Sequence, residues 1–273
     1  MKAQDLEDLE IDLLLEALDR RYGYDFRRYA RASLRRRLKQ FIERERLRSI
    51  ADLVPAALRE PGFLDRLVNG ISVSVTEPFR EPVCLAAVRQ HVFPWLQSHA
   101  YCKIWHAGCS SGEEVYSLAI LLDEAGMLDR VQVYGTDINT DALAVARAAI
   151  YPLEAMRRAE ENYERAGGQR KLSDYYVAQY GRAKLSARLA RNLVFSQHNL
   201  ATDAAFGEMQ FILCRNVLIY FNRELQARVF KLFSGSLARR GFLALGAKES
   251  MGTEDAKQRF ETIDSAARLF RAL

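Results

Sequence analysis

The most constraining feature of this 273-residue sequence is the segment 103–118, which reads KIWHAGCSSGEEVYSL. An apolar run ends at a tight turn between Gly108 and Gly112, and a helical apolar pattern begins directly after it. A strand that passes through a glycine turn into a helix lets a ligand approach the backbone closely, at the positive end of the helix dipole. The segment therefore predicts an α/β domain with a ligand site at this turn.

The rest of the C-terminal part repeats the alternation of strand and helix. Strands are predicted at 102–106, 131–136, 193–196, 210–214, 242–246 and, as a last strand, 267–273, and helices at 113–125, 140–148 and 223–238. This order predicts a parallel sheet with helices on both faces. The connection from Asp137 to Asn199 is longer than a helix and two loops need, so we expect an inserted subdomain at about 151–190.

The N-terminal part has a helical period instead. Helices are predicted at 5–19, 26–46, 50–60 and 62–69, so residues 1–72 should form a small all-helical domain before a second domain at 73–273. Residues 1–19 carry a formal charge of −6 and residues 20–48 a charge of +9. Four cations recur at steps of three and four on the second predicted helix and should form one exposed basic ridge, namely Arg28, Arg31, Arg35 and Lys39.

Composition excludes several classes. The chain is 49% hydrophobic and 27% charged, which is typical of soluble globular proteins. No apolar run approaches the roughly 20 residues that cross a bilayer, and the opening MKAQDLEDLE is too acidic for a secretory signal. The four cysteines show no C-x-x-C spacing, which argues against zinc ribbons and redox pairs and leaves no expected metal site. We expect a reduced, cytoplasmic protein.

The glycine turn is unusual for a pyrophosphate site. Ser110 replaces the second glycine of the dinucleotide-binding pattern, and Glu113 and Glu114 open the helix where the phosphate would lie. The two carboxylates would suit a cationic ligand, such as a sulfonium cofactor that carries an amino group. The alternative is a tight turn followed by two surface glutamates. Asp137, at the end of the second strand, has the position of a ribose-binding acid. The alternative role is a helix cap, although Thr140 or Asp141 could fill that role equally well.

Five segments in order carry a family resemblance. They are the glycine turn at 105–117, VTEPFR at 75–80, TDIN at 136–139, HNL at 198–200 and CRNVLIYF at 214–221. Together they resemble the motifs of the CheR-type chemotaxis receptor methyltransferases, which are protein-glutamate O-methyltransferases. Two positions depart from the family pattern: Ser74 stands where the family often has Asn, and Pro78 replaces one of two paired aromatic residues.

The resemblance implies a Rossmann-like class I methyltransferase fold, S-adenosylmethionine as cofactor and the cytoplasmic domain of a chemoreceptor as partner. The reaction that it implies forms γ-glutamyl methyl esters during sensory adaptation. Carried over by position, the cofactor contacts are Ser74, Thr76, Arg80, Gly108, Glu114, Asp137, Asn199, Leu200, Asn216 and Val217. Arg80 and Tyr220 are expected beside the reacting methyl group. Spacing favours Glu114 over Glu113, and the choice between them stays open.

The chemistry of such a reaction agrees with the residues present. A glutamate carboxylate, with a pKa of about 4.3, is ionised near neutrality, so methyl transfer to it needs no general base. His198 is therefore expected to be a packed or capping residue, and Tyr220, at the end of the fourth predicted strand, is a candidate for either core or catalysis. For Arg80 alone, a surface or salt-bridged role is the alternative.

The basic ridge is interpreted as a surface that binds the acidic receptor. A nucleic-acid partner is disfavoured, because few aromatic residues interleave the ridge and residues 49–273 are nearly neutral. Two other functions remain open: a methyltransferase of the same fold that acts on another protein or a small carboxylate, and a signalling scaffold that binds without turnover.

Overall fold

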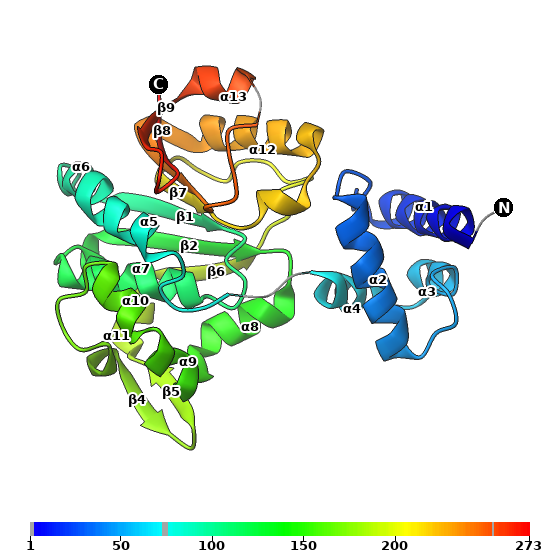
Figure 1. Cartoon of the computed structure of the whole chain (residues 1–273), viewed down its shortest axis with the longest axis horizontal. Helices are drawn as coiled ribbons and strands as arrows, with labels where there is room; N and C mark the ends of the chain where they lie inside the picture. Colours follow the sequence, from blue (N-terminus) through cyan, green and yellow to red (C-terminus); the bar gives the residue numbers. More distant parts are fainter. Residues whose placement is uncertain (1–2, 73–75, 253) are drawn as a thin grey trace.

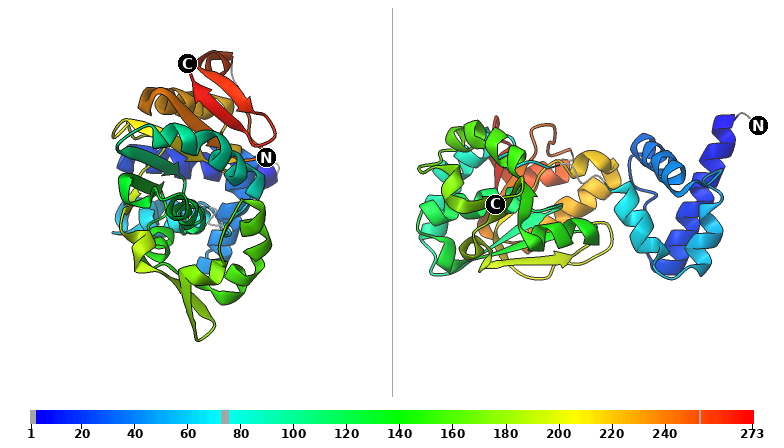
Figure 2. Two further views of the ribbon diagram at one scale, coloured as in Figure 1. Left: turned by 90° about the vertical axis from the view of Figure 1, so that its left-hand side faces the viewer. Right: turned by 90° about the horizontal axis from the view of Figure 1, so that it is seen from below.

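The structure is a computed structural model that describes residues 3–72, 76–252 and 254–273. Ser74 lies outside the described residues. An N-terminal helical domain lies beside a larger domain built on a central sheet (Figures 1 and 2). None of the helices in the described part of the chain combines the length and the hydrophobicity that a membrane crossing requires.

The N-terminal domain consists of four helices, which are α1 (Ala3–Tyr22), α2 (Arg31–Glu45), α3 (Leu53–Arg59) and α4 (Phe63–Ile71). Helix α1 ends where Gly23 adopts a φ of +71°, a conformation that glycine tolerates without strain. Leu34, Leu38 and Phe41 of α2 are fully buried against α1, α3 and α4. These three residues form the apolar stripe of the helix, and the half-buried Ile42 packs against the same cluster.

The larger domain contains a seven-stranded sheet in the order β6-β2-β1-β7-β8-β10-β9. Its strands are β1 (Cys102–Ala107), β2 (Val131–Asp137), β6 (Leu193–Gln197), β7 (Met209–Cys214), β8 (Leu237–Leu245), β9 (Phe260–Asp264) and β10 (Leu269–Ala272). The first five strands in this order are parallel, whereas β10 runs antiparallel to β8 and β9. The sheet is therefore mixed, and the prediction of a parallel sheet is wrong for its last two strands. Strand β9 was not predicted.

Helices cover both faces of the sheet. They are α5 (Pro82–Ala87), α6 (Phe93–Gln97), α7 (Glu113–Glu124), α8 (Thr140–Ala148), α12 (Arg223–Ser236) and α13 (Glu254–Arg259). Neighbouring residues of β1 point to opposite faces: Ile104 joins the core beneath α7, and Trp105 joins the core beneath α12. Both side chains are fully buried, so β1 is covered on both faces, as is typical of a parallel sheet with helices on each side.

The long connection after β2 contains a second, antiparallel sheet in the order β3-β5-β4. Its elements are β3 (Ile150–Pro152), α9 (Leu153–Arg158), α10 (Glu160–Arg165), β4 (Tyr176–Gln179), β5 (Arg182–Leu185) and α11 (Ala187–Ala190). The β4–β5 hairpin projects away from the main sheet (Figure 1).

Backbone hydrogen bonds as well as side-chain contacts hold the two domains together. The N–H of Ala30 donates to the carbonyl of Tyr220 at 2.8 Å, and the N–H of Asn222 donates to the carbonyl of Arg28 at 2.8 Å. The ring of Tyr29 packs edge-on against Phe221, with 5.1 Å between centroids. These contacts hold residues 26–30 outside the helix, so α2 begins at Arg31 rather than at Phe26 as predicted.

Candidate active site

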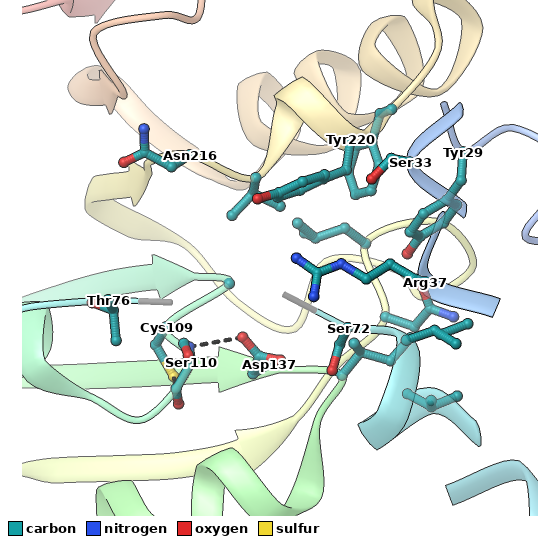
Figure 3. Close-up of a pocket in the computed structure, with 18 of the residues that line it drawn as sticks. Tyr29, Ser33, Arg37, Ser72, Thr76, Cys109, Ser110, Asp137, Asn216 and Tyr220 are labelled. Carbon is teal, nitrogen blue, oxygen red and sulfur yellow. Dashed lines mark hydrogen bonds between the residues drawn. The ribbon is translucent and has the colours of Figure 1, made fainter. Parts of the chain in front are cut away.

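One cavity lies at the carboxyl ends of β1, β2 and β7, and the N-terminal domain forms its far wall (Figure 3). The space open to the centres of water molecules is about 140 Å³. Ten residues selected from the sequence line it: Thr76, Arg80, Gly108, Glu114, Asp137, Asn199, Leu200, Asn216, Val217 and Tyr220. Residues up to 144 positions apart in the chain, Thr76 and Tyr220, therefore meet at one edge of the sheet, as expected for open α/β sheets.

The glycine turn forms the floor of the cavity. Gly108 has a φ of +75°, and a Cβ atom there would lie 2.3 Å from Cγ2 of Val217. A Cβ on Gly112, which has a φ of +88°, would lie 2.8 Å from the Cβ of Ala146. Both positions therefore require glycine, one for the approach of the 217 loop and the other for the packing of α8.

Asp137 is held at the tip of β2 by backbone donors. The N–H of Ser110 donates to Oδ2 at 2.7 Å, and the N–H of Asn139 donates to Oδ1 at 2.9 Å. Burial raises the pKa of Asp137, and these N–H groups oppose that rise. The remaining lone pairs of the carboxylate are available to hydroxyl donors in the cavity. Asp137 does not cap α8; Asn139 does, accepting the N–H of Ala142 at 2.9 Å, so neither Asp137 nor the alternatives Thr140 and Asp141 has that role.

The two glutamates at the start of α7 point in different directions. Glu114 lines the cavity, whereas Glu113 turns away and accepts the Ser111 hydroxyl at 2.8 Å. Glu114 is buried and pairs with Nη1 of Arg215, and its Oε2 lies 3.2 Å from Nε2 of His106. Although burial would raise the pKa of Glu114, the charge of Arg215 holds that pKa below its ordinary value.

Arg215 is the centre of a buried ion network that sequence analysis missed. Its Nη2 donates to Oε2 of Glu81 and to the carbonyl of Arg80, both at 2.9 Å. Together with the pair to Glu114, these bonds connect the start of α7, the end of β7 and the 80–81 loop. The CRN segment contained the residue, but only the fold reveals that three chain segments converge on it.

Glu249 is a second residue that sequence analysis missed. Its carboxylate accepts backbone N–H groups from Gly246 and from consecutive residues of the 216–219 loop, at 2.7–3.3 Å. The side chain is 4% exposed. The loop that presents Asn216, Val217 and Tyr220 to the cavity is therefore shaped by one carboxylate from beyond β8.

Four non-glycine residues around the cavity have a positive φ: Phe79 at 53°, Glu81 at 51°, Ser110 at 51° and Asn216 at 60°. Each such conformation costs on the order of 1 kcal/mol or more, and clusters of them occur at functional sites. At Glu81 and Asn216 the strained backbone is held by the carboxylates of the network and of Glu249.

Arg80 and Tyr220 approach the cavity from two sides. Arg80 is half-buried, with Nε 4.0 Å from Oε1 of Glu81. The ring of Tyr220 extends into the cavity (Figure 3) from a 3-10 turn, Leu218–Tyr220, that follows β7. Tyr220 is thus not at the end of the strand itself, as predicted, but in the turn after it.

His198 is a packed residue, as predicted. Its ring lies against Trp105 and Phe206, and its Nε2 is 3.1 Å from the carbonyl oxygen of Ala204. The following Asn199 is buried, and its Oδ1 accepts the N–H of Ala201 at 2.9 Å.

The wall formed by the N-terminal domain was not predicted. It comprises Phe26, Tyr29, Ala30, Ser33, Leu34, Arg37, Val68, Ile71 and Ser72. Ser33 and Arg37 recur at a step of four on α2, on the side opposite the predicted ridge. A resemblance of each domain to a family does not predict this wall, because the wall depends on how the two domains pack against each other.

The predicted basic ridge is largely neutralised within the chain. Its ion pairs are Arg31 with Asp8 and Asp12, Arg35 with Glu7 and Asp8, Lys39 with Glu7, and Arg28 within 3.9 Å of Asp25 and Glu224. Arg28 and Lys39 are exposed as predicted, but Arg31 and Arg35 are only half-exposed, and the ridge is not a row of uncompensated charges. The acidic helix α1 packs against α2 and compensates its charge, and Arg28 precedes α2 rather than belonging to it.

The cavity has the features that S-adenosylmethionine requires. Asp137 offers a carboxylate to ribose hydroxyls, and Ile138, Leu200, Val68 and Ile71 offer apolar surface to a purine. Gly108 lets a ligand lie close to the backbone. Glu114, at the start of α7, lines the cavity, and Arg215 already compensates its charge.

Comparison with known proteins gives a consistent result. Residues 74–268 match the family model described as CheR methyltransferase, SAM binding domain, and residues 9–72 match CheR methyltransferase, all-alpha domain. The chain is 46% identical to "Putative methyltransferase Cher3" of Pseudomonas putida over 97% of both proteins. It is 33% identical to chemotaxis protein methyltransferase 2 of Pseudomonas aeruginosa, over 81% of this chain and 77% of the relative. It is 28% identical to the chemotaxis protein methyltransferase of Listeria monocytogenes, over 90% and 92%.

Proposed function

We propose, from the premise that this chain belongs to the CheR methyltransferase family, that it methylates glutamate side chains of a chemoreceptor's cytoplasmic domain. Membership makes it an S-adenosylmethionine-dependent methyltransferase. The finer proposal is that the product is a γ-glutamyl methyl ester, formed during sensory adaptation in the cytoplasm. The partner is a protein and not a nucleic acid.

The observation that carries the proposal is the convergence of ordered motifs on one cavity. Gly108 of β1, Asp137 of β2 and Asn216 beyond β7 line the same space as Arg80 and Tyr220. The first three suit a nucleoside cofactor, and the last two are the polar groups available to an acceptor.

Methyl transfer requires little from the protein beyond holding the cofactor and the acceptor carboxylate in position. When bound, S-adenosylmethionine supplies a methyl group on a positively charged sulfur that leaves as a neutral thioether. The acceptor carboxylate is ionised at neutral pH, with a pKa of about 4.3, so no proton has to be removed. Holding the two reactants in line can contribute roughly 7–11 kcal/mol to catalysis. The cavity between the domains provides such an enclosure.

Specific roles follow for the residues at the cavity. Arg80 orients the acceptor carboxylate through a charge-assisted hydrogen bond, and the Tyr220 hydroxyl holds one of its oxygens or faces the methyl group. Thr76, Glu114, Asn199, Leu200, Asn216 and Val217 complete the contacts of the cofactor. Glu114, which Arg215 already compensates, acts by shaping this end of the cavity and by offering its remaining lone pairs to an ammonium group.

Labelled methyl transfer tests the proposal. The chain is incubated with S-adenosylmethionine labelled in the methyl group and with the cytoplasmic fragment of a chemoreceptor, and the modified fragment is treated with mild base. We expect the label to be released as methanol, because methyl esters hydrolyse under conditions that leave methylamines intact. A base-stable label would identify a different acceptor group. Binding of S-adenosylhomocysteine without transfer would favour a non-catalytic scaffold.

A further inference from the structure

We propose that Tyr29 of the N-terminal domain binds the adenosine part of the cofactor through its phenol hydroxyl. The N-terminal domain thereby contributes a contact to the cofactor and does not only cover it. This inference rests on the proposed function, since it requires the cofactor to lie in the cavity between the domains. Tyr29 lies outside all five of the ordered sequence motifs.

The first step is the fixed position of the Tyr29 ring. It packs against the rings of Phe26 and Phe221, with 5.1 Å between centroids in both pairs. A β-bridge joins the backbones of Tyr29 and Phe221, and the next N–H, that of Ala30, donates to the carbonyl of Tyr220. Both the ring and the backbone of Tyr29 are therefore held where the two domains meet.

A second attachment holds the N-terminal domain against the start of α8. Oδ1 of Asn69, in α4, accepts the N–H of Thr140 at 3.2 Å, and Nδ2 of Asn139 donates to the Ser72 hydroxyl at 2.6 Å. Asn139 comes two residues after Asp137, so this attachment lies next to the strand end that carries the Asp137 carboxylate. Because the domain is attached at two places, its wall of the cavity keeps a constant position relative to that carboxylate.

The second step is that the Tyr29 hydroxyl faces the cavity without a partner. Figure 3 shows the side chain of Tyr29 at the cavity, with its hydroxyl turned inward. Within the part of the chain that the structure describes, this hydroxyl forms no hydrogen bond. Burial and the charge of Asp137 raise the pKa of Tyr29, so the hydroxyl is a neutral donor near pH 7. Tyrosine hydroxyls in enclosed positions generally have a hydrogen-bond partner, and a ligand can supply one here.

The third step is the choice of the cofactor over the acceptor. Asp137, whose charge acts on Tyr29, keeps lone pairs for ribose hydroxyls after binding two backbone N–H groups. The proposed function places the reacting methyl group at Arg80 and Tyr220, which is the opposite end of the cofactor. The part of the ligand beside Tyr29 is therefore the nucleoside. Adenosine carries ribose hydroxyls and ring nitrogens, all of which can accept the proton of a phenol.

Tyr24 provides a matched control in the same segment. It is half-buried, as Tyr29 is, and its ring also contacts Phe26, with 6.0 Å between centroids. Tyr24 does not line the cavity, whereas Tyr29 does. Tyr24→Phe and Tyr29→Phe thus remove the same group at similar depth, and only one of them removes it from the cavity.

The experiment uses the full chain and these two variants. In Tyr29→Phe the ring remains for packing against Phe26 and Phe221, and the hydroxyl is lost. Affinity for S-adenosylhomocysteine is measured by calorimetry without any receptor. KM for a chemoreceptor cytoplasmic fragment is measured at saturating S-adenosylmethionine, and Tm is measured on the free protein.

We expect Tyr29→Phe to weaken the affinity for S-adenosylhomocysteine about threefold to tenfold, the factor that one neutral hydrogen bond gives. Its KM for the fragment and its Tm should equal those of wild type, and Tyr24→Phe should equal wild type in all three measurements. An unchanged affinity for S-adenosylhomocysteine in Tyr29→Phe would overturn the assignment. So would a raised KM for the fragment, which would move Tyr29 to the acceptor, or a lowered Tm, which would make its role structural.

Failure of the proposed function gives a different result. In that case wild type binds S-adenosylhomocysteine but transfers no base-labile methyl group to the fragment, and the difference in affinity between Tyr29→Phe and Tyr24→Phe is still measurable.

Discussion

Glu249 is the residue on which the shape of the 216–219 loop depends. Replacement by Gln keeps its size but substitutes an NH₂ group for one oxygen that accepts backbone N–H groups. We expect Glu249→Gln to lower the affinity for S-adenosylhomocysteine about tenfold and the free energy of unfolding by about 2 kcal/mol. Calorimetry and urea unfolding measure the two effects. Glu254→Gln, at an exposed ion pair with Lys257, is the control, and equal behaviour of the two variants would contradict this role.

The adjacent glutamates at the start of α7 should respond to pH with opposite signs. The pKa of Glu114 is lowered in the fold despite burial, because Arg215 pairs with it, so its contribution to stability is complete above its ordinary pKa of 4.5 and is lost as pH falls below that value. Burial raises the pKa of Glu113, so its ionisation opposes folding as pH rises above 4.5.

We therefore expect Glu114→Gln to lower Tm at neutral pH and to flatten the fall of Tm on acidification. Glu113→Gln should leave Tm at neutral pH unchanged or raise it. Scanning calorimetry from about pH 3.5 to pH 7 measures both. An undiminished acid slope in Glu114→Gln would show that the buried pair with Arg215 does not contribute as described.

At the scale of single residues, sequence analysis identified those whose role is local and missed those whose role is made by distant contacts. Gly108 and Asp137 stand in a turn and at a strand end that can be recognised from neighbouring residues. Arg215, Glu249 and Arg37 look like ordinary charged residues in the sequence. Their roles arise from partners between 30 and 135 positions away, or from the packing of one domain on another.

At the scale of elements, the turn between β1 and α7 must fit against the 217 loop. Gly108→Ala would place a methyl group 2.3 Å from Cγ2 of Val217 and would also strain a φ of +75°. We expect at least a tenfold loss of affinity for S-adenosylhomocysteine, because the loop must move by enough to relieve the contact. Calorimetry measures the loss.

A matched control separates the contact from the strain. Gly126 has a φ of +66°, and a Cβ there would have no atom within 4 Å. Gly126→Ala should cost on the order of 1 kcal/mol of stability and leave cofactor affinity unchanged. Similar affinities in the two variants would mean that the approach of Val217 does not shape the cavity.

Element boundaries were predicted well where the hydrophobic pattern was strong and poorly where tertiary contacts compete with it. Helix α8 begins and ends as predicted, since its apolar residues recur at helical spacing and Asn139 caps it. Helix α2 begins five residues late because Tyr29 is held against Phe221. The antiparallel β9 is short, and three of its five residues are polar, so no buried run marks it.

At the scale of the whole molecule, the cavity exists because the two domains are fixed to each other. The hydrogen bond from Ala30 to Tyr220 joins α2 directly to the turn that presents the Tyr220 ring. Ala30 has a φ of −60°, which proline also adopts. Ala30→Pro therefore removes the N–H donor with little backbone strain.

We expect Ala30→Pro to reduce kcat/KM about threefold to tenfold while lowering the free energy of unfolding by about 1 kcal/mol, the value of one neutral hydrogen bond. Ala30→Ser, which keeps the N–H, should resemble wild type in both measurements. Unaltered kinetics in Ala30→Pro would indicate that the docking of the domains does not position Tyr220.

The uneven distribution of charge between residues 1–19 and residues 20–48 can likewise be understood only from the whole molecule. Sequence analysis interpreted the +9 segment as a surface for an acidic partner, but the −6 segment before it supplies five of the carboxylates that compensate it, namely Glu7, Asp8, Asp12, Glu16 and Asp19. Net charge along a sequence cannot distinguish an internal ion-pair lattice from a binding surface, because the distinction depends on which helices pack together. A receptor-binding role for Arg28, Arg31, Arg35 and Lys39 stays a prediction.

The most direct test of the cofactor site is a crystal structure of the chain with S-adenosylhomocysteine. We predict that the ribose hydroxyls bind the carboxylate of Asp137 and that the purine lies between Leu200 and the N-terminal domain. The amino-acid end should point toward Gly108 and Glu114. A ligand bound elsewhere on the molecule, or one whose ribose lies away from Asp137, would contradict this prediction.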